Sequence, residues 1–322
     1  MNEPASGGLI EGVGNTPLLE LTEIPGLSPP VRLFAKLESV NPGGSIKDRS
    51  VSRIIAAAVA AGHLGEGRRL LDSSSGNAGI AYAMFGAAAG VGVTLVIPAN
   101  ASRERLDRIA AHGAEVILTD PIEGYDFALR EAARLAAEQP DRYWYANQYA
   151  NENNWRAHYE TTGPEIIEQL ARITHQPPDA FVVGVGTGGT LTGTGRRLKE
   201  LHPGIHIATV IPDRFPGIEG LKPLGLPGDI VPEILDQDLI DERIDVSSEA
   251  ALDMAATLAR RGLFVGPSSG AYVHAAVEVG RRGGHRTVVT ILNDTGERYG
   301  STGMWSQPSN PDFSTARAAV PR

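Results

Sequence analysis

A lysine near the amino terminus stands in a motif that can make its amine reactive. The segment Asn41-Pro-Gly-Gly-Ser-Ile-Lys-Asp-Arg49 joins a turn-forming Pro-Gly-Gly to Ser45, which can cap a helix, so Lys47 is expected in the first turn of that helix. The positive end of the helix dipole opposes an ammonium there and lowers its pKa. An amine with a lowered pKa can form a Schiff base. A solvated surface lysine is the alternative interpretation of this motif taken alone.

A second motif collects hydrogen-bond donors at a turn. Asp72-Ser-Ser-Ser-Gly-Asn-Ala-Gly79 places three hydroxyls, an amide and two glycines between an expected strand and an expected helix. Side-chain donors together with free backbone N–H groups in such a turn bind a carboxylate. The alternative is a loop that only turns the chain.

A third motif is typical of phosphate binding. Phe181-Val-Val-Gly-Val-Gly-Thr-Gly-Gly-Thr-Leu-Thr-Gly193 runs from an apolar strand through close-set glycines into a helix. The N-terminus of a helix attracts phosphate, and the hydroxyls of Thr187 and Thr190 suit a terminal phosphate monoester.

The same segment also fits a dinucleotide fold. Gly184, Gly186 and Gly189 match the pattern G-x-G-x-x-G, and Asp213 lies at the end of the next expected strand. A nucleotide-binding oxidoreductase is therefore an alternative at this point.

A fourth motif, Val265-Gly-Pro-Ser-Ser-Gly-Ala271, lies between a short strand and a helix. A serine there can make one hydrogen bond to a ring nitrogen, or it can simply cap the helix. The eight histidines show no metal-ligand spacing and are interpreted as structural, so no metal site is expected.

Alternating apolar strands and helices must position these motifs, which indicates a parallel α/β architecture. Because the strands are continuous apolar runs, their sheets should be covered on both faces. The expected strands are 93–98, 115–119, 142–147, 179–185, 205–211 and 286–292. The expected helices are 80–89, 102–112, 125–139, 190–201, 248–261 and 270–281.

Length and composition limit the class of protein. A chain of 322 residues suggests two lobes, and 42% hydrophobic with 21% charged residues is ordinary for a globular protein. Lys and Arg number 29 against 38 Asp and Glu, giving −9, which argues against nucleic acid as the main partner. Cysteine is absent, so disulfides and thiolate nucleophiles are excluded. The uncharged stretch 73–102 is interrupted by several glycines and Pro98, so we expect no membrane span. We expect a cytoplasmic protein.

The four motifs, in this order, resemble those of the cysteine synthase branch of the fold-type II pyridoxal-phosphate enzymes. The resemblance covers about residues 9 to 304. Further matches are Gly14-Asn-Thr-Pro-Leu18, Gln148-Tyr-Ala-Asn151, Thr161-Thr-Gly-Pro-Glu165 and Gly296-Glu-Arg-Tyr-Gly-Ser-Thr302.

The resemblance implies an α/β fold of two lobes, each a mostly parallel sheet flanked by helices. Residues 45–150 would form a smaller, mobile substrate-binding lobe, and residues 1–44 with 151–306 a larger cofactor-binding lobe. Residues 307–322 are expected to be a loose tail, since they are rich in Ser, Pro and Ala. The resemblance also implies a homodimer.

Functional roles follow from the same resemblance. Lys47 resembles the lysine that holds pyridoxal 5′-phosphate as a Schiff base, Asn77 the residue at the cofactor's 3′-hydroxyl, and Ser268 the residue facing its pyridine nitrogen. The residues similar to the cofactor phosphate loop are Gly186, Thr187, Gly188, Gly189 and Thr190. The residues similar to the substrate-binding pocket are Ser74, Ser75, Asn77 and Gln148, with Gly220 and Lys222 on a mobile substrate loop.

The implied reaction is β-replacement on an activated serine, O-acetylserine or O-phosphoserine, with sulfide or another sulfur donor, to give L-cysteine. Alternatives are another β-replacement or β-elimination, such as cystathionine synthesis, cysteine desulfhydration or use of an amine nucleophile. A catalytically silent regulatory homologue and the oxidoreductase are further alternatives.

Three departures from the family pattern bear on the substrate. Ala78 stands where a hydroxyl usually helps to hold the substrate, and Ile211-Pro212-Asp213 stands where an acidic residue and proline usually end a strand. Lys222 stands where glycine is usual. An O-phospho leaving group carries close to two negative charges, which Lys222, with Arg214 as a helper, could neutralise. A solvated surface lysine is the alternative.

Overall fold

The chain folds around two separate sheets, and the computed structural model describes residues 8–65, 67–74, 76–224 and 230–305. The larger sheet has the strand order β1-β2-β10-β7-β8-β9, and every neighbouring pair is parallel except β1 with β2. Its strands are β1 (Leu18–Leu21), β2 (Arg32–Leu37), β7 (Ala180–Gly184), β8 (His206–Pro212), β9 (Glu242–Val246) and β10 (Thr287–Leu292).

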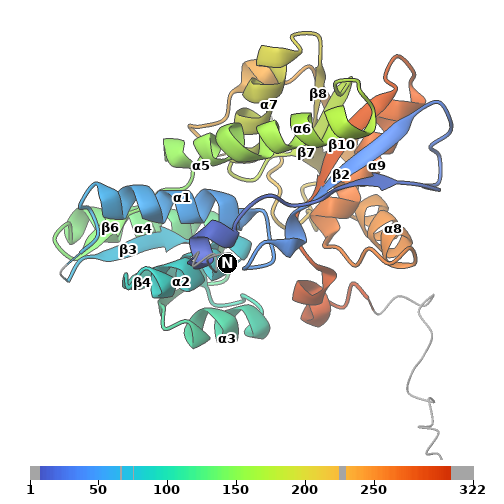
Figure 1. Cartoon of the computed structure of the whole chain (residues 1–322). Coiled ribbons are helices and arrows are strands. Elements are labelled where there is room, and N and C mark those ends of the chain that lie inside the picture. Colours follow the sequence, from blue (N-terminus) through green and yellow to red (C-terminus); the bar gives the residue numbers. More distant parts are fainter. Residues whose placement is uncertain (1–7, 66, 75, 225–229, 306–322) are drawn as a thin grey trace, which may run out of the picture.

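The smaller sheet is entirely parallel, in the order β5-β4-β3-β6. Its strands are β3 (Arg69–Ser73), β4 (Val93–Pro98), β5 (Glu115–Thr119) and β6 (Tyr143–Tyr145). In Figure 1 this sheet and its helices occupy one side of the molecule, and the larger sheet and its helices occupy the other. The predicted α/β class with two parallel-sheet lobes is confirmed, whereas the exact lobe limits at 45 and 150 stay predictions.

Helices flank both sheets and bury their apolar faces against them. The helices are α1 (Lys47–Ala60), α2 (Asn77–Ala88), α3 (Arg103–Ala111), α4 (Gly124–Glu138), α5 (Glu152–Ala157), α6 (Gly163–Ile173), α7 (Gly189–Leu201), α8 (Ser248–Ala259) and α9 (Pro267–Arg281). Helix α2 is apolar on all sides and is buried along most of its length, which explains the long uncharged stretch in the sequence. Among the described residues, no helix is both long and apolar enough to cross a membrane.

Each strand and helix range given above is present within three residues, but the short strand expected before Gly266 is only an isolated bridge between Val265 and Thr295. The elements that were not expected are β1, β2, β9, α5 and α6. Charged residues interrupt the apolar run in each of the three strands, namely Glu20 in β1, Lys36 in β2 and Asp245 in β9, and the prediction relied on continuous apolar runs. Strand β2 contains Lys36, which is fully buried because its ammonium is paired inside the protein. The cap assigned to Ser45 is wrong: Ile46 is the N-cap residue of α1, and Ser45 Oγ only accepts a 3.3 Å hydrogen bond from the backbone of Lys47. The expected tail at 307–322 lies outside the described residues.

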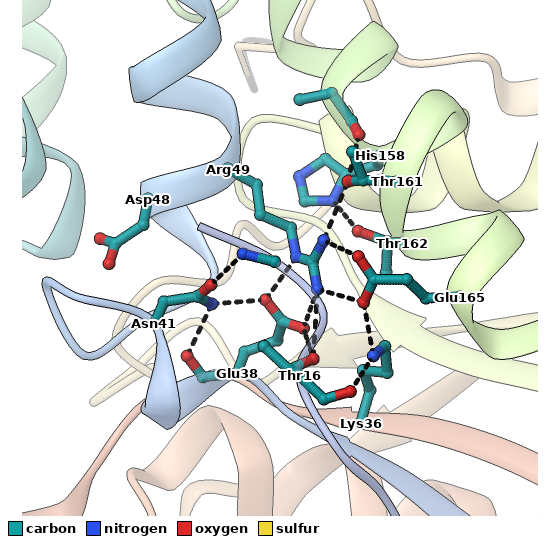
Figure 2. Close-up of polar contacts among 12 residues, drawn as sticks. Thr16, Lys36, Glu38, Asn41, Asp48, Arg49, His158, Thr161, Thr162 and Glu165 are labelled. Carbon is teal, nitrogen blue, oxygen red and sulfur yellow. Dashed lines mark hydrogen bonds and ion pairs between the residues drawn. The ribbon is translucent and has the colours of Figure 1, made fainter. Parts of the chain in front are cut away.

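A buried network of charges ties α1 to the larger sheet (Figure 2). The guanidinium of Arg49 forms a fork with Glu38, at 2.7 and 2.8 Å, and a second one with Glu165, at 2.7 and 2.8 Å. Lys36 Nζ lies 2.6 Å from the Glu165 carboxylate and also donates to the carbonyl of Thr16. Two cations and two anions therefore balance inside the protein, and they hold α1, β2 and α6 together. This network anchors the helix on which Lys47 lies.

Candidate active site

All predicted site residues except Ser75 and Gly189 line one cavity of about 650 Å³ between the two sheets. Its walls come mainly from segments that follow the carboxyl ends of the parallel strands β3, β6, β7, β8 and β10. Ligands of open α/β sheets bind at this end of the strands. The volume lies within the range usual for cofactor and small-molecule sites.

Lys47 is the first residue of α1 and lines the cavity, as the motif predicts. Burial lowers the pKa of Lys47 from 10.5 to about 8, although the nearby carboxylate of Asp294 favours the charged amine. Burial, and not the helix dipole that the motif suggested, is the main cause of the lowered pKa of Lys47. A substantial share of this amine is therefore neutral and nucleophilic near pH 8.

The glycine-rich loop between β7 and α7 forms a second wall. Gly186, Thr187, Gly188 and Thr190 line the cavity. Gly188 has a φ of +85°, which glycine adopts without strain, and it is the N-cap residue from which α7 begins at Gly189. Gly189 is the one predicted loop residue outside the cavity lining. The loop thus presents a helix N-terminus and two hydroxyls to the cavity, the arrangement that binds a phosphate.

The serine-rich turn after β3 forms the opposite wall together with the segment after β6. Ser74 and Gln148 both line the cavity, whereas Ser75 lies outside the described residues. Behind them, the buried carboxylate of Asp72 accepts hydrogen bonds from the backbone N–H of Ser73, at 2.8 Å, and of Gln148, at 3.3 Å. Burial raises the pKa of Asp72 to about 6, although these N–H groups favour its charged form. Asp72 therefore holds together the two segments that carry the predicted carboxylate pocket.

Ser268 lies in the first turn of α9 and also lines the cavity. Its Oγ accepts a 3.1 Å hydrogen bond from the Nδ2 amide of Asn293. Because that contact uses the oxygen as an acceptor, the hydroxyl proton of Ser268 is left for another partner. Asn293 is a residue that the sequence analysis missed.

Asn77 lines the cavity, but its amide is already engaged by the protein. Its Nδ2 donates to the Asp294 carboxylate at 2.7 Å, and its Oδ1 accepts from Arg298. The same Asp294 oxygen accepts a 2.7 Å hydrogen bond from the hydroxyl of Tyr299, and burial raises the pKa of Asp294. The sequence analysis missed the roles of Asp294, Arg298 and Tyr299, although the quoted Gly296–Thr302 match contains the last two.

The loop after β8, residues 213–223, covers the cavity. The carbonyl of Gly220 lies so close to Gly186 that a Cβ on Gly186 would be 2.5 Å from it. Glu219 forms an ion pair with Arg105 of α3, a buried cation that was not predicted from the sequence, and both residues line the cavity. The guanidinium of Arg105 also lies 5.3 Å from the ring centre of Tyr299. This loop therefore contacts both lobes.

Lys222 lies on the same loop and lines the cavity, so it is not a solvated surface lysine. Its ammonium is 3.3 Å from the Asp126 carboxylate of α4 and lies over the rings of Tyr149, at 5.2 Å, and Tyr125, at 5.9 Å. The charge of Lys222 is thus already compensated by the smaller lobe.

Asp213, the residue that the dinucleotide interpretation would place at a ribose, is held by Ser248 at the start of α8. Both of its carboxylate oxygens accept hydrogen bonds from Ser248, one from the backbone N–H at 2.9 Å and one from the hydroxyl at 2.6 Å.

Comparison with known proteins agrees with this geometry. The family model described as "Pyridoxal-phosphate dependent enzyme" matches residues 9–294. The chain belongs to this family. Cysteine synthase of Aquifex aeolicus is 44% identical to this pyridoxal-phosphate enzyme over 92% of both chains. Cysteine synthase of Entamoeba histolytica has a TM-score of 0.84 at 31% identity, over 97% of this chain and 95% of that one. O-ureido-L-serine synthase has a TM-score of 0.85 at 32% identity, over 97% of this chain and 99% of that one.

The cavity of this pyridoxal-phosphate enzyme fits the cofactor. A Cβ on Gly186 or Gly188 would lie 2.5 or 2.9 Å from its nearest neighbour, so the loop packs closely only with glycines. Asp294 Oδ1 is buried without a hydrogen-bond partner among the described residues, beside the Lys47 amine. An amine, a helix N-terminus with two hydroxyls, and a serine hydroxyl thus face one chamber, matching the carbonyl, phosphate and ring nitrogen of pyridoxal phosphate.

Proposed function

We propose that this enzyme makes L-cysteine by β-replacement on O-acetylserine, with sulfide as the sulfur donor. The observation that carries the proposal is the neutral Ser268 hydroxyl in a chamber that also contains the Lys47 amine and the predicted carboxylate pocket. A hydroxyl cannot hold a pyridine nitrogen protonated as a carboxylate can, so the ring is a weaker electron sink. This favours loss of the β-substituent over transamination. The identity with cysteine synthases supports the same reaction.

Each residue then has a chemical task. Lys47 holds the cofactor, and the phosphate loop 186–190 with Ser268 orients it. Pyridoxal phosphate, when bound, supplies the electron sink that lets the bonds at the substrate's α- and β-carbons break. Ser74 and Gln148 bind the substrate carboxylate, and the amine of Lys47, whose pKa burial lowers, accepts the α-proton as a general base.

The pairing of Lys222 supports a neutral leaving group. Asp126 and two tyrosine rings already compensate the charge of Lys222. Lys222 is therefore not an unpaired cation available to bind a phosphate leaving group. The loop that carries Lys222 covers the cavity and excludes water while the β-substituent is exchanged. The homodimer and the cytoplasmic location stay predictions, and light scattering of the purified protein would test the dimer.

Cysteine formation from O-acetylserine and sulfide, measured by thiol colorimetry, tests this function. The parent should turn over, and Lys47→Ala should fold and show no multiple turnover, because Lys222, the other lysine in the described cavity lining, is paired with Asp126. Turnover by Lys47→Ala would overturn the role of Lys47. A parent that carries the cofactor but makes cysteine from no activated serine would overturn the proposed function.

A further inference from the structure

One buried side chain, Asn154 of α5, contacts both halves of the proposed active site. Only 2% of its surface is exposed, and it does not line the cavity. Its Nδ2 donates a 2.7 Å hydrogen bond to the carbonyl of Gln148, in the carboxylate pocket, and a 2.9 Å hydrogen bond to Thr187 Oγ1, in the phosphate loop.

The orientation of this amide follows from its partners. The carbonyl of Gln148 is only an acceptor, so the atom 2.7 Å from it must be the nitrogen of Asn154. The second hydrogen of that nitrogen points to Thr187, whose oxygen is then an acceptor. The hydroxyl proton of Thr187 is thereby left free for donation into the cavity, where a phosphate needs it.

Close packing holds Asn154 against the start of α7. A Cβ built on Gly189 would lie 2.0 Å from Asn154 Oδ1, and one built on Gly193 would lie 2.0 Å from the carbonyl of Trp155. The glycine face of α7 therefore lets α5 approach within side-chain contact. Gly189, which lies outside the cavity lining, packs against Asn154 in this way.

A second residue of the same segment adds a parallel contact. His158, one turn beyond Asn154, has its Nε2 3.3 Å from Thr190 Oγ1 and its Nδ1 2.9 Å from Thr162 Oγ1. Burial lowers the pKa of His158 well below 6.5, and the charges of Arg49 and Lys47 act in the same direction. Each threonine of the phosphate loop therefore has a neutral partner on the segment 152–162.

We propose that Asn154 is a positioning residue that couples the cofactor phosphate loop to the substrate carboxylate pocket. Through Thr187 it directs a hydroxyl proton toward the phosphate. Through its hydrogen bond to the carbonyl of Gln148 it fixes the position of that residue, whose backbone N–H donates to Asp72. Loss of its two N–H donors should weaken the binding of both the cofactor and the substrate amino acid, although Asn154 contacts neither. The substrate half of this inference rests on the proposed function.

The test compares Asn154→Ala and Asn154→Asp with Asn153→Ala. Asn153 is the adjacent residue of α5, and its side-chain amide bonds Asn151 Oδ1 within the same turn, so its loss should change nothing at the site. Asn154→Asp keeps the shape but replaces the donor with a carboxylate. Three quantities are measured on the holoenzymes: the rate of cofactor loss to a trapping reagent, the ³¹P chemical shift of the bound phosphate, and KM for O-acetylserine.

We expect both Asn154 variants to lose the cofactor roughly tenfold faster or more, with a shifted ³¹P signal and a raised KM, and Asn153→Ala to match the parent. In a double-mutant cycle, Asn154→Ala should add little to cofactor loss in a Thr187→Ala background, because the effect passes through Thr187. Fully additive effects in that cycle would show a general packing role and overturn the proposal. Parent-like cofactor release and ³¹P shift in Asn154→Asp would also overturn it. Cofactor release and the ³¹P shift do not depend on which amino acid the enzyme uses. These two measurements therefore test the role of Asn154 even if the proposed reaction is wrong.

Discussion

Removing the negative charge of Glu165 should destabilise the protein strongly, although Glu165 is outside the cavity lining. Its carboxylate accepts two hydrogen bonds from Arg49, one from the backbone of Asn15 at 3.0 Å, and the ion pair with Lys36. Burial would raise the pKa of Glu165, but Arg49 and Lys36 outweigh burial and lower it from 4.5 to about 2. A difference of roughly 2.5 pKa units corresponds to about 3 kcal/mol of folding free energy at neutral pH.

Glu165→Gln keeps the side-chain shape and leaves two buried cations facing one carboxylate. Breaking a buried ion pair in this way costs about 3–5 kcal/mol, in agreement with the value from the pKa. Equilibrium urea unfolding of parent and variant at equal cofactor content measures the difference. Glu168→Gln is the matched control, because Glu168 is on the same helix and pairs with Arg172 at the exposed surface. Its effect should stay within about 0.5 kcal/mol.

The pH dependence of this difference provides a second check. A carboxylate whose pKa is lowered by folding stabilises the protein fully above its unfolded pKa, near 4.5, and loses that contribution as the pH falls toward 2. The gap between parent and Glu165→Gln should therefore be constant from pH 8 to 5 and shrink below about 4.5. A gap under about 1 kcal/mol at pH 7, or one that grows with acid, would refute the reasoning that Glu165 is held ionised by Arg49 and Lys36.

Three further outcomes are expected. Thr187→Ala and Thr190→Ala should each weaken cofactor retention by about 1.5–3 kcal/mol, measured by fluorescence titration with pyridoxal phosphate, and unchanged affinity in both would place the phosphate elsewhere. Lys222→Ala should change kcat/KM equally for O-acetylserine and O-phosphoserine, since Asp126 already compensates Lys222. A loss of about 1.5–3 kcal/mol confined to O-phosphoserine would instead assign phosphate recognition to Lys222. The rate of covalent cofactor attachment should rise with pH through a midpoint near 8, the pKa of Lys47, and a midpoint near 10.5 would contradict the effect of burial.

The sequence alone was enough to predict the architecture and most of the cavity wall. Continuous apolar strands alternating with helices require parallel sheets, and the loops after parallel strands meet at one edge. The motifs that follow β7 and β8 therefore had to meet at one edge of the larger sheet, whereas their meeting with the motif after β3, in the smaller sheet, was decided by how the two sheets pack. Lys47, the phosphate loop and Ser268 could be found because each lies within a short local motif, and glycines and serines at such spacing are typical of ligand-binding turns.

Only the tertiary structure decided which buried side chains pair with one another to hold the residues around the cavity in place. Asp294 meets Asn77 across 217 residues, and Arg49 meets Glu165 across 116. Such pairs leave no periodic pattern in the chain, because a single buried polar residue is paired by the fold and not by its neighbours in sequence. Lys36 is the clearest example: a lysine predicts a surface position, but the carboxylate of Glu165, which α6 brings to it, lets Lys36 lie fully buried in β2.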